Sequence, residues 1–304
     1  MIYTKDFSVI VPTWRGAIKY LPKLIKSIPE KDGVEIIIVD NSQDPINREE
    51  INSERNIVLL HSDSSRHAGG SRNVGILAAR GRWLLFADAD DFFSREAFDI
   101  FYSKLNSNAE IIYTGMGGVY EDTGEVSQRG YEYAKMVHDY CIGVANDSIL
   151  RYGFSSPCCK MINHNLVNRH SLRFDEIRAS NDVFFSITSG FYAKTIEAVD
   201  VITYIATVNR GSLTQRRDYD VISARLYATL HCNSFLKQNG LRKYQRSIMR
   251  CLYEARSFSL LQKYRLLKMI IAYRQNPFIG CTRWSKSFFE LRKKNKEEKK
   301  YIIS

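Results

Sequence analysis

The first half of this chain alternates short, strongly apolar runs with stretches of helical periodicity, and no other feature restricts the fold as much. Such alternation is typical of βαβ units, in which helices cover a mostly parallel sheet. Helical spacing covers Ala17–Ile28 and Ser71–Arg80. The runs that we expect to form buried strands are Phe7–Val11, Glu35–Val39, Asn56–Leu60 and Trp83–Ala87. We therefore predict an α/β fold with a mostly parallel sheet and helices on both faces.

Each of these four predicted strands is followed directly by polar or turn-forming residues. In an open sheet of this kind, ligands bind beyond the carboxyl ends of the strands. The residues that occupy these positions are Pro12 and Thr13, Asp40 and Asn41, His61 and Ser62, and the acidic run Asp88–Asp91. We expect the functional site to lie at this edge.

The strongest local signal is the run FADADD, in which an apolar strand ends in three carboxylates within four residues. Carboxylates this close repel one another, and a cation is needed to keep them ionised in a cleft. A hard divalent ion, held by one or two carboxylates and by phosphate oxygens, is the usual solution. The alternative is a helix N-terminus capped by Asp90, Asp91 or Ser94. The position after a buried strand favours the metal.

Two further segments carry weaker signals. Asp40 closes the second strand, where its carboxylate can accept hydrogen bonds from a nucleobase or a ribose; alternatively it forms a plain turn with Asn41 and Asp44. The segment HAGGSRNVGI opens a helix with two glycines, and its Arg72 is suited to a phosphate or a base edge. No GxGxxG follows the first strand, and GxxxxGK[ST] does not occur in the sequence.

Together, the segments FSVIVPTW, EIIIVDNSQD, GGSRNVGI and FADADD resemble the successive nucleotide-binding segments of GT-A glycosyltransferases of the large inverting family 2. The resemblance is close over residues 5–92, looser to about residue 215 and absent beyond. It implies a Rossmann-like GT-A catalytic domain over residues 1–215. Within it, residues 1–92 would form the nucleotide-binding half and residues 93–215 the acceptor-side half. Residues 216–304 would form a basic α-helical extension.

The resemblance also assigns roles to individual residues. Pro12, Thr13 and Asp40 would hold the base, usually uracil, and Arg72 would approach the nucleotide. In the acidic run, Asp88 would bind the ribose and Asp90 the metal, with Asp88 as a second metal ligand and Asp91 facing the donor sugar.

Two segments farther along match the family less cleanly. RFDEIRASNDVFF resembles the segment that supplies the general base, which implies Asp182. Asn181 stands where the family usually has glutamate, and Asp182 can equally be read as a plain helix N-cap. VNRGSLTQ resembles the segment that closes over the donor, so Arg210 would meet the diphosphate.

The function that these motifs imply is an inverting transfer of a sugar from a nucleotide diphosphate donor, expected to be a UDP-sugar, with Mn²⁺ or Mg²⁺ as cofactor. The acceptor would be a saccharide or a lipid-linked saccharide, most often of a bacterial cell-surface polysaccharide. A nucleotidyltransferase is one rival, but such enzymes usually carry a glycine-rich basic loop after the first strand, whereas VPTWRGAIKY has a single glycine. A nucleic-acid-binding module that uses the basic tail is the other rival.

The net charge of +11 is concentrated at the end of the chain, where Arg216–Ser304 hold 21 Lys and Arg against 6 Asp and Glu. This helical tail, interleaved with aromatic residues, has three interpretations: packing on the catalytic domain, contact with anionic lipid, or binding of nucleic acid. We regard nucleic acid as the least favoured. The first apolar run is too short for a signal peptide, so we expect a cytosolic protein with reduced, mostly buried cysteines, peripheral at the inner face of the membrane if the tail binds lipid.

Overall fold

The computed structural model of the protein describes residues 3–209 and 216–279. The chain divides into two compact units, Met1–Gln215 and Arg216–Ser304. The strands, all in the first unit, are β1 (Lys5–Thr13), β2 (Val34–Asp40), β3 (Ile57–His61), β4 (Gly81–Phe86), β5 (Phe92–Phe93), β6 (Ile111–Tyr120), β7 (Lys160–Asn163) and β8 (Ile196–Val208). The helices of this unit are α1 (Leu21–Lys26), α2 (His67–Ala78), α3 (Ala97–Ser103), α4 (Tyr131–Cys141), α5 (His164–Arg169) and α6 (Val183–Tyr192), with short 3₁₀ turns at Arg15–Tyr20, Arg48–Glu50 and Ser64–Arg66 and a π turn at Ile149–Gly153.

One sheet organises the first unit. Its strand order is β3-β2-β1-β4-β7-β6-β8-β5. The pairs β1–β2, β1–β4, β2–β3 and β6–β8 are parallel, and the pairs of β7 with β4 and β6 and of β5 with β8 are antiparallel. The mostly parallel α/β sheet predicted from the sequence is confirmed.

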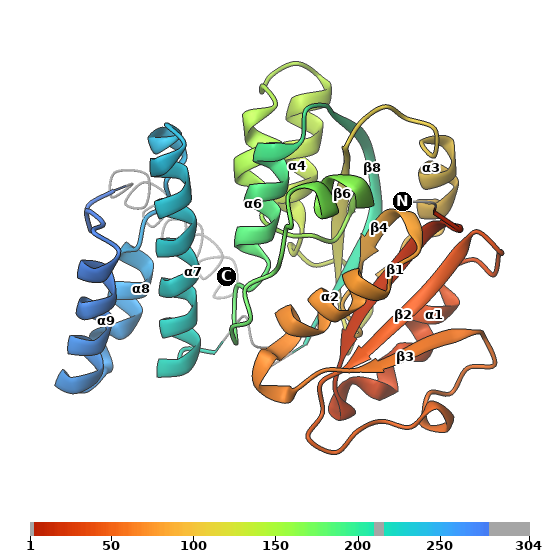
Figure 1. Ribbon diagram of the computed structural model, residues 1–304, viewed down its shortest axis with the longest axis horizontal. Helices are drawn as coiled ribbons and strands as arrows, with labels where there is room; N and C mark the ends of the chain where they lie inside the picture. Colours follow the sequence, from red (N-terminus) through yellow and green to blue (C-terminus); the bar gives the residue numbers. More distant parts are fainter. Residues whose placement is uncertain (1–2, 210–215, 280–304) are drawn as a thin grey trace, which may run out of the picture. The chain divides into compact units, whose positions relative to one another are not determined.

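Helices cover both faces of the sheet because successive residues of a strand point to opposite sides. On β1, Ile10 contacts α2 so closely that a Cβ at Gly75 would lie 2.4 Å from its Cγ2. Phe7, an odd number of residues away, instead packs edge-on against Phe98 of α3, with ring centroids 6.2 Å apart. Figure 1 shows α2 crossing in front of β1. A strand buried on both faces explains why β1 and β2 read as continuous apolar runs.

One local prediction was only partly correct. The helix expected over Ala17–Ile28 is a 3₁₀ turn followed by the short helix α1, which restarts with Pro22 in its first turn, a position where the missing N–H of proline is tolerated. Gly115, Gly117 and Gly118 lie inside β6, whose pairing with β8 shifts register at Gly115. These glycines allow close packing, since a Cβ at Gly118 would lie 2.5 Å from the carbonyl oxygen of Arg129.

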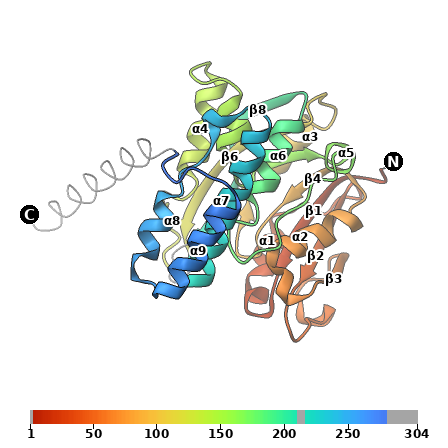
Figure 2. The same ribbon diagram turned by 60° about the vertical axis from the view of Figure 1, so that its left-hand side comes forward.

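In its described part, the second unit consists of helices. They are α7 (Tyr219–Gln238), α8 (Met249–Glu254) and α9 (Leu260–Ala272), with 3₁₀ turns at Arg242–Tyr244 and Ala255–Ser257. Figures 1 and 2 show α7, α8 and α9 side by side. Helix α7 ends at Gln238, and Gly240, two residues beyond it, has φ +75°. Across the described residues, no helix is both long and apolar enough to cross a membrane.

Candidate active site

The register of the sheet brings the predicted strand-end residues together at one edge. Thr13 of β1 pairs with Asp40 of β2, and Asp40 pairs with His61 of β3. On the other side of β1, Ile10 pairs with Phe86 of β4, so the acidic run begins at the same edge. Pro12 and Thr13 are both buried, and Oγ1 of Thr13 has no hydrogen-bond partner among the described residues. A buried hydroxyl without a partner is uncommon, so this oxygen is a candidate to bond a ligand.

Asp40 is 1% exposed, and both of its carboxylate oxygens accept hydrogen bonds from the protein. Oδ1 accepts from the backbone N–H and the hydroxyl of Ser42, at 3.0 and 2.6 Å. Oδ2 accepts from the backbone N–H of Ile46 at 2.9 Å and lies 3.3 Å from Nδ1 of His61. The carboxylate therefore shapes the loop that follows β2, a role beyond the nucleotide contact expected from the sequence.

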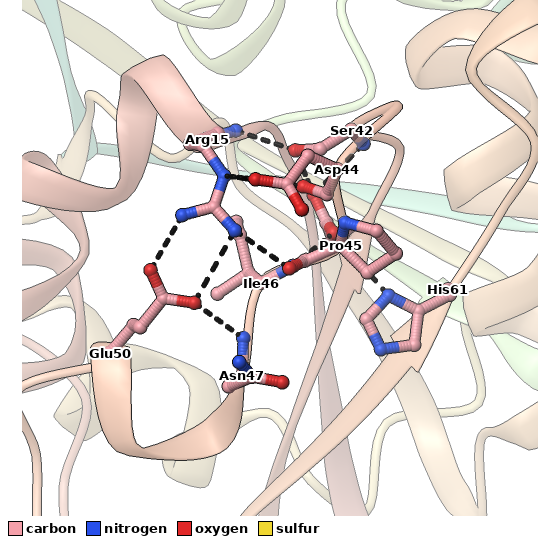
Figure 3. A network of polar contacts seen from close by, with 9 residues as sticks. Arg15, Ser42, Asp44, Pro45, Ile46, Asn47, Glu50 and His61 are labelled. Atoms are coloured by element: carbon pink, nitrogen blue, oxygen red, sulfur yellow. Dashed lines mark hydrogen bonds and ion pairs between the residues drawn. The ribbon is translucent and has the colours of Figure 1, made fainter.

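Arg15, which the sequence analysis did not single out, fastens the same loop to the turn after β1 (Figure 3). Its backbone N–H donates to Oγ of Ser42 at 2.7 Å. Its guanidinium contacts carboxylates of Asp44 and Glu50 at 3.0 and 2.6 Å and donates to the carbonyl of Pro45 at 2.7 Å. Trp14, directly before it, is 61% exposed. The network thus joins the segment that follows β1 to the loop that follows β2.

The three carboxylates of the acidic run have different surroundings. The side chain of Asp88 is 39% exposed and pairs with Arg72. Burial raises the pKa of Asp90 to about 6, and the negative charge of Asp88 adds to the rise. Burial also raises the pKa of Asp91 well above its usual value, with further contributions from Asp88 and Asp90. Crowded carboxylates with raised pKa values are the pattern expected where a cation binds.

Asp91 is directed into the protein. Its Oδ2 accepts a hydrogen bond from the hydroxyl of Tyr204 at 2.8 Å, and its Oδ1 accepts from the backbone N–H of Thr207 at 2.7 Å. The same tyrosine oxygen accepts from the backbone N–H of Asp88 at 2.8 Å. With both oxygens bound and 4% of the residue exposed, Asp91 is placed to position the acidic run, which differs from the expectation that it faces the donor sugar.

Arg72 of α2 connects the acidic run to the segment before α6. Its Nη2 donates to Oδ1 of Asp88 at 2.5 Å, and its Nη1 donates to Oδ1 of Asn181 at 2.7 Å. The guanidinium lies over the ring of Phe174, 5.3 Å from its centroid. Arg72 is 5% exposed, and its Nε has no hydrogen-bond partner among the described residues. A buried cation with a spare donor is suited to an anionic ligand.

Gly69 of the segment HAGGSRN allows close packing between α2 and the segment before α6. A Cβ at Gly69 would lie 2.0 Å from the carbonyl oxygen of Asp175, so only glycine permits this approach. The side chain of Asn73 donates to the carbonyl of Phe174 at 3.0 Å and accepts from its N–H at 2.8 Å. These contacts hold the residues around Asp182 against the helix that carries Arg72.

Asp182 lies at the N-cap position of α6, but its backbone is helical and its side chain makes no capping hydrogen bond within the described chain. The capping alternative is therefore not supported by the geometry. Burial raises the pKa of Asp182, and the positive charge of Arg72 opposes the rise. A carboxylate that is partly withdrawn from water and has a raised pKa is a stronger base than an exposed one.

The donor set for a divalent ion is small. Over residues 3–209 and 216–279, no three His, Cys, Asp or Glu side chains are arranged to hold a metal. Because Asp91 is bound to Tyr204 and Thr207, Asp88 and Asp90 remain as the candidate ligands of the acidic run. Two carboxylates, completed by phosphate oxygens and water, fit Mg²⁺ or Mn²⁺. Arg210, the predicted diphosphate contact, lies outside the described residues.

Three comparisons with known proteins place these features in a family. The model of "Glycosyl transferase family 2" matches residues 8–170, which include most of β1, the strands β2 to β7 and the whole acidic run. The chain is 26% identical over 227 residues to the putative glycosyltransferase EpsH of Bacillus subtilis, covering 71% of this chain and 65% of that protein. It is 24% identical over 272 residues to the succinoglycan biosynthesis protein ExoO of Rhizobium meliloti, covering 84% and 76%.

A solved structure shares the fold. Residues 1–349 of TarS from Staphylococcus aureus, in complex with UDP-GlcNAc, superpose with a TM-score of 0.61 at 21% identity, covering 88% of this chain and 80% of that one. Full-length TarS is a poly(ribitol-phosphate) beta-N-acetylglucosaminyltransferase, of which this chain spans 36% at 33% identity in one strain. The fold is thus GT-A, and with the family model matching more than half of its length, this chain belongs to glycosyl transferase family 2.

Proposed function

We propose that this protein transfers a sugar, with inversion, from a nucleoside diphosphate donor to an acceptor hydroxyl. One observation carries the proposal: Arg72 contacts both Asp88 of the acidic run and Asn181, the neighbour of Asp182. Groups suited to a diphosphate and a candidate general base therefore belong to one site. A transfer reaction needs both within reach of one sugar.

The nucleotide would bind across the ends of β1 and β2. Oγ1 of Thr13 and Nε of Arg72 are buried polar atoms still able to bond a ligand, and neither has a partner among residues 3–209. Because both oxygens of Asp40 already accept hydrogen bonds, a base N–H would displace its longest contact, the 3.3 Å one to His61. UDP is our candidate nucleotide, since UDP and UDP-GlcNAc bind the structurally similar TarS.

Asp88 and Asp90 would hold Mn²⁺ or Mg²⁺ together with the diphosphate. The bound ion would supply positive charge against the negative charge that develops on the leaving diphosphate. Its presence would also relieve the repulsion that contributes to the raised pKa of Asp90. Asp91 and Tyr204 would act as positioning residues, because the hydroxyl of Tyr204 links the backbone of Asp88 to the carboxylate of Asp91.

The chemical step is a single displacement at the anomeric carbon. The acceptor oxygen forms its bond to that carbon as the bond to the diphosphate oxygen breaks, and the electron pair leaves with the diphosphate. Asp182 accepts the proton of the acceptor hydroxyl, which is worth about 10²- to 10⁴-fold in rate for general base catalysis. Attack opposite the leaving group inverts the configuration.

For the acceptor, we propose a saccharide or a lipid-linked saccharide in the synthesis of a bacterial cell-surface polysaccharide. The support is that similar proteins are a succinoglycan biosynthesis protein and a poly(ribitol-phosphate) beta-N-acetylglucosaminyltransferase. Family membership disfavours the two rivals, a nucleotidyltransferase and a nucleic-acid-binding module.

The test is a panel of UDP-, GDP- and dTDP-sugars with and without Mn²⁺, read by thermal stabilisation and by release of the nucleoside diphosphate. We expect one UDP-sugar with Mn²⁺ to raise the unfolding temperature and to release UDP. NMR of the product should show the inverted anomer. Failure of every nucleotide sugar to bind would contradict the proposal, and release of pyrophosphate from a nucleoside triphosphate plus a sugar phosphate would support a nucleotidyltransferase instead.

A further inference from the structure

Helix α9 has two apolar faces, and only one of them is packed. On the inner face, Leu266 and Ile270 are 2% and 5% exposed and join a core with residues of α7 and α8. A surface helix normally turns a polar face outward. In α9, the outer face is also apolar.

The outer face forms one continuous stripe. Positions 260, 264, 267 and 271 are separated by four, three and four residues, which places them along one side of a helix. The four residues, which we call the α9 stripe, are Leu260, Tyr264, Leu267 and Ile271, and their exposed fractions are 85%, 53%, 52% and 64%. Four adjacent apolar side chains at this exposure are typical of an interaction surface.

The charge of the segment that carries the stripe is of one sign. Between residues 255 and 279 the chain carries five Lys and Arg and no Asp or Glu: Arg256, Lys263, Arg265, Lys268 and Arg274. At 100° per residue, Lys263 and Lys268 lie on the two flanks of the stripe. The ammonium group of Lys268 lies 4.9 Å from the ring centroid of Tyr264, so its aliphatic stem extends along the apolar surface.

A groove of about 210 Å³ lies beside the stripe and shares Leu267 with it. Its walls include Leu252, Leu266 and Ile270, and the cations Arg256 and Lys263 also line it. An apolar groove with cations beside it fits a molecule that combines hydrocarbon with negative charge.

We propose that the α9 stripe docks the protein on an anionic lipid bilayer, with α9 lying in the plane of the headgroups. Apolar side chains between basic flanks are the features of an interfacial helix. A second copy of the chain fits poorly, because pairing two stripes would bring lysines of the same sign together. The inference goes beyond the proposed function, and its test needs no activity measurement. It also narrows the lipid contact considered for the basic tail to one helix, α9, within the described residues.

The test is co-sedimentation of the full chain with vesicles of phosphatidylcholine containing 30% phosphatidylglycerol, or of phosphatidylcholine alone. We expect binding to the anionic vesicles, weakened by 0.5 M salt, and little binding to the neutral ones. Leu267→Glu should reduce the binding by about tenfold or more, because it removes a leucine that would enter the bilayer and adds a negative charge that the anionic lipid repels. Leu77→Glu is the matched control, since Leu77 is a 73% exposed leucine on α2 and the charge change is the same.

Circular dichroism should show that both variants are folded. The double substitution Lys263→Gln and Lys268→Gln is a second test, because it removes two basic residues and leaves the apolar stripe intact. Wild-type binding by Leu267→Glu would overturn the proposal. So would equal losses in Leu267→Glu and Leu77→Glu, which would indicate a response to net charge alone. Light scattering that shows a dimer abolished by Leu267→Glu, with vesicle binding unchanged, would assign the stripe to a second copy of the chain.

Discussion

The guanidinium of Arg72 donates to Oδ1 of Asn181 across 109 residues of sequence, at 2.7 Å. This contact joins the helix that follows β3 to the residue directly before the candidate base, Asp182. The contact also gives Asn181 a role. Where the family usually has a glutamate, the neutral amide of Asn181 accepts a hydrogen bond from Arg72, so Arg72 forms its ion pair with Asp88. A neutral neighbour leaves the pKa of Asp182 subject mainly to burial and to Arg72.

Asn181→Asp should therefore shift the pH dependence of transfer. The substitution is nearly isosteric and adds a negative charge beside Asp182. A like charge disfavours ionisation, so the pKa of Asp182 should rise further. Because the base acts when deprotonated, the acid limb of the kcat profile should move to higher pH. A kcat profile identical to that of the wild type would exclude electrostatic coupling between the two positions.

Asp182→Asn should remove transfer and leave donor binding in place. The amide preserves the size of the side chain but cannot accept the acceptor's proton, so kcat should fall by about 10²- to 10⁴-fold. UDP binding by calorimetry should change little, because Asp182 contributes to the chemical step. Turnover at the wild-type rate would remove Asp182 from the mechanism.

The sheet and its functional edge could be predicted because their signals are local. Continuous apolar runs identify strands buried on both faces, and polar residues after each run mark the edge. The contacts that assemble the site are not local. Tyr204 reads as an ordinary strand residue, and only the pairing of β8 beside β6 and β5 brings its hydroxyl to Asp91. From the sequence, Gly69 had the features of an anion-binding glycine. In the structure, its lack of a side chain allows the carbonyl of Asp175 to approach the helix.

Tyr204→Phe should weaken both the fold and metal binding. It removes the hydroxyl that links the backbone of Asp88 to the carboxylate of Asp91, leaving a buried donor and a buried acceptor short of a partner. Such losses cost about 1–3 kcal/mol each. Urea unfolding should report a lower free energy, and titration with Mn²⁺ a weaker affinity.

Tyr113→Phe is the matched control for that substitution. Tyr113 is also fully buried, but its hydroxyl has no hydrogen-bond partner among the described residues. Removing the hydroxyl of Tyr113 should change the free energy of unfolding by less than removing the hydroxyl of Tyr204. Equal effects of the two substitutions would show that the bridge between Asp88 and Asp91 contributes little.

Asp90 makes stability depend on pH in a defined direction. Its pKa is about 6 in the folded protein and 3.8 in an exposed chain, so between these values the folded state binds more protons. The free energy of unfolding should therefore fall as pH rises from about 4 to 6, by up to about 3 kcal/mol for a shift of this size. Asp90→Asn should flatten this fall and raise stability at pH 7.

Mn²⁺ should stabilise the wild type more at pH 7 than at pH 5, because it binds the ionised carboxylate of Asp90. Urea unfolding at several pH values measures both effects. A wild-type stability that rises through this window, with no response to Asp90→Asn, would contradict both the raised pKa and the assignment of Asp90 as a metal ligand.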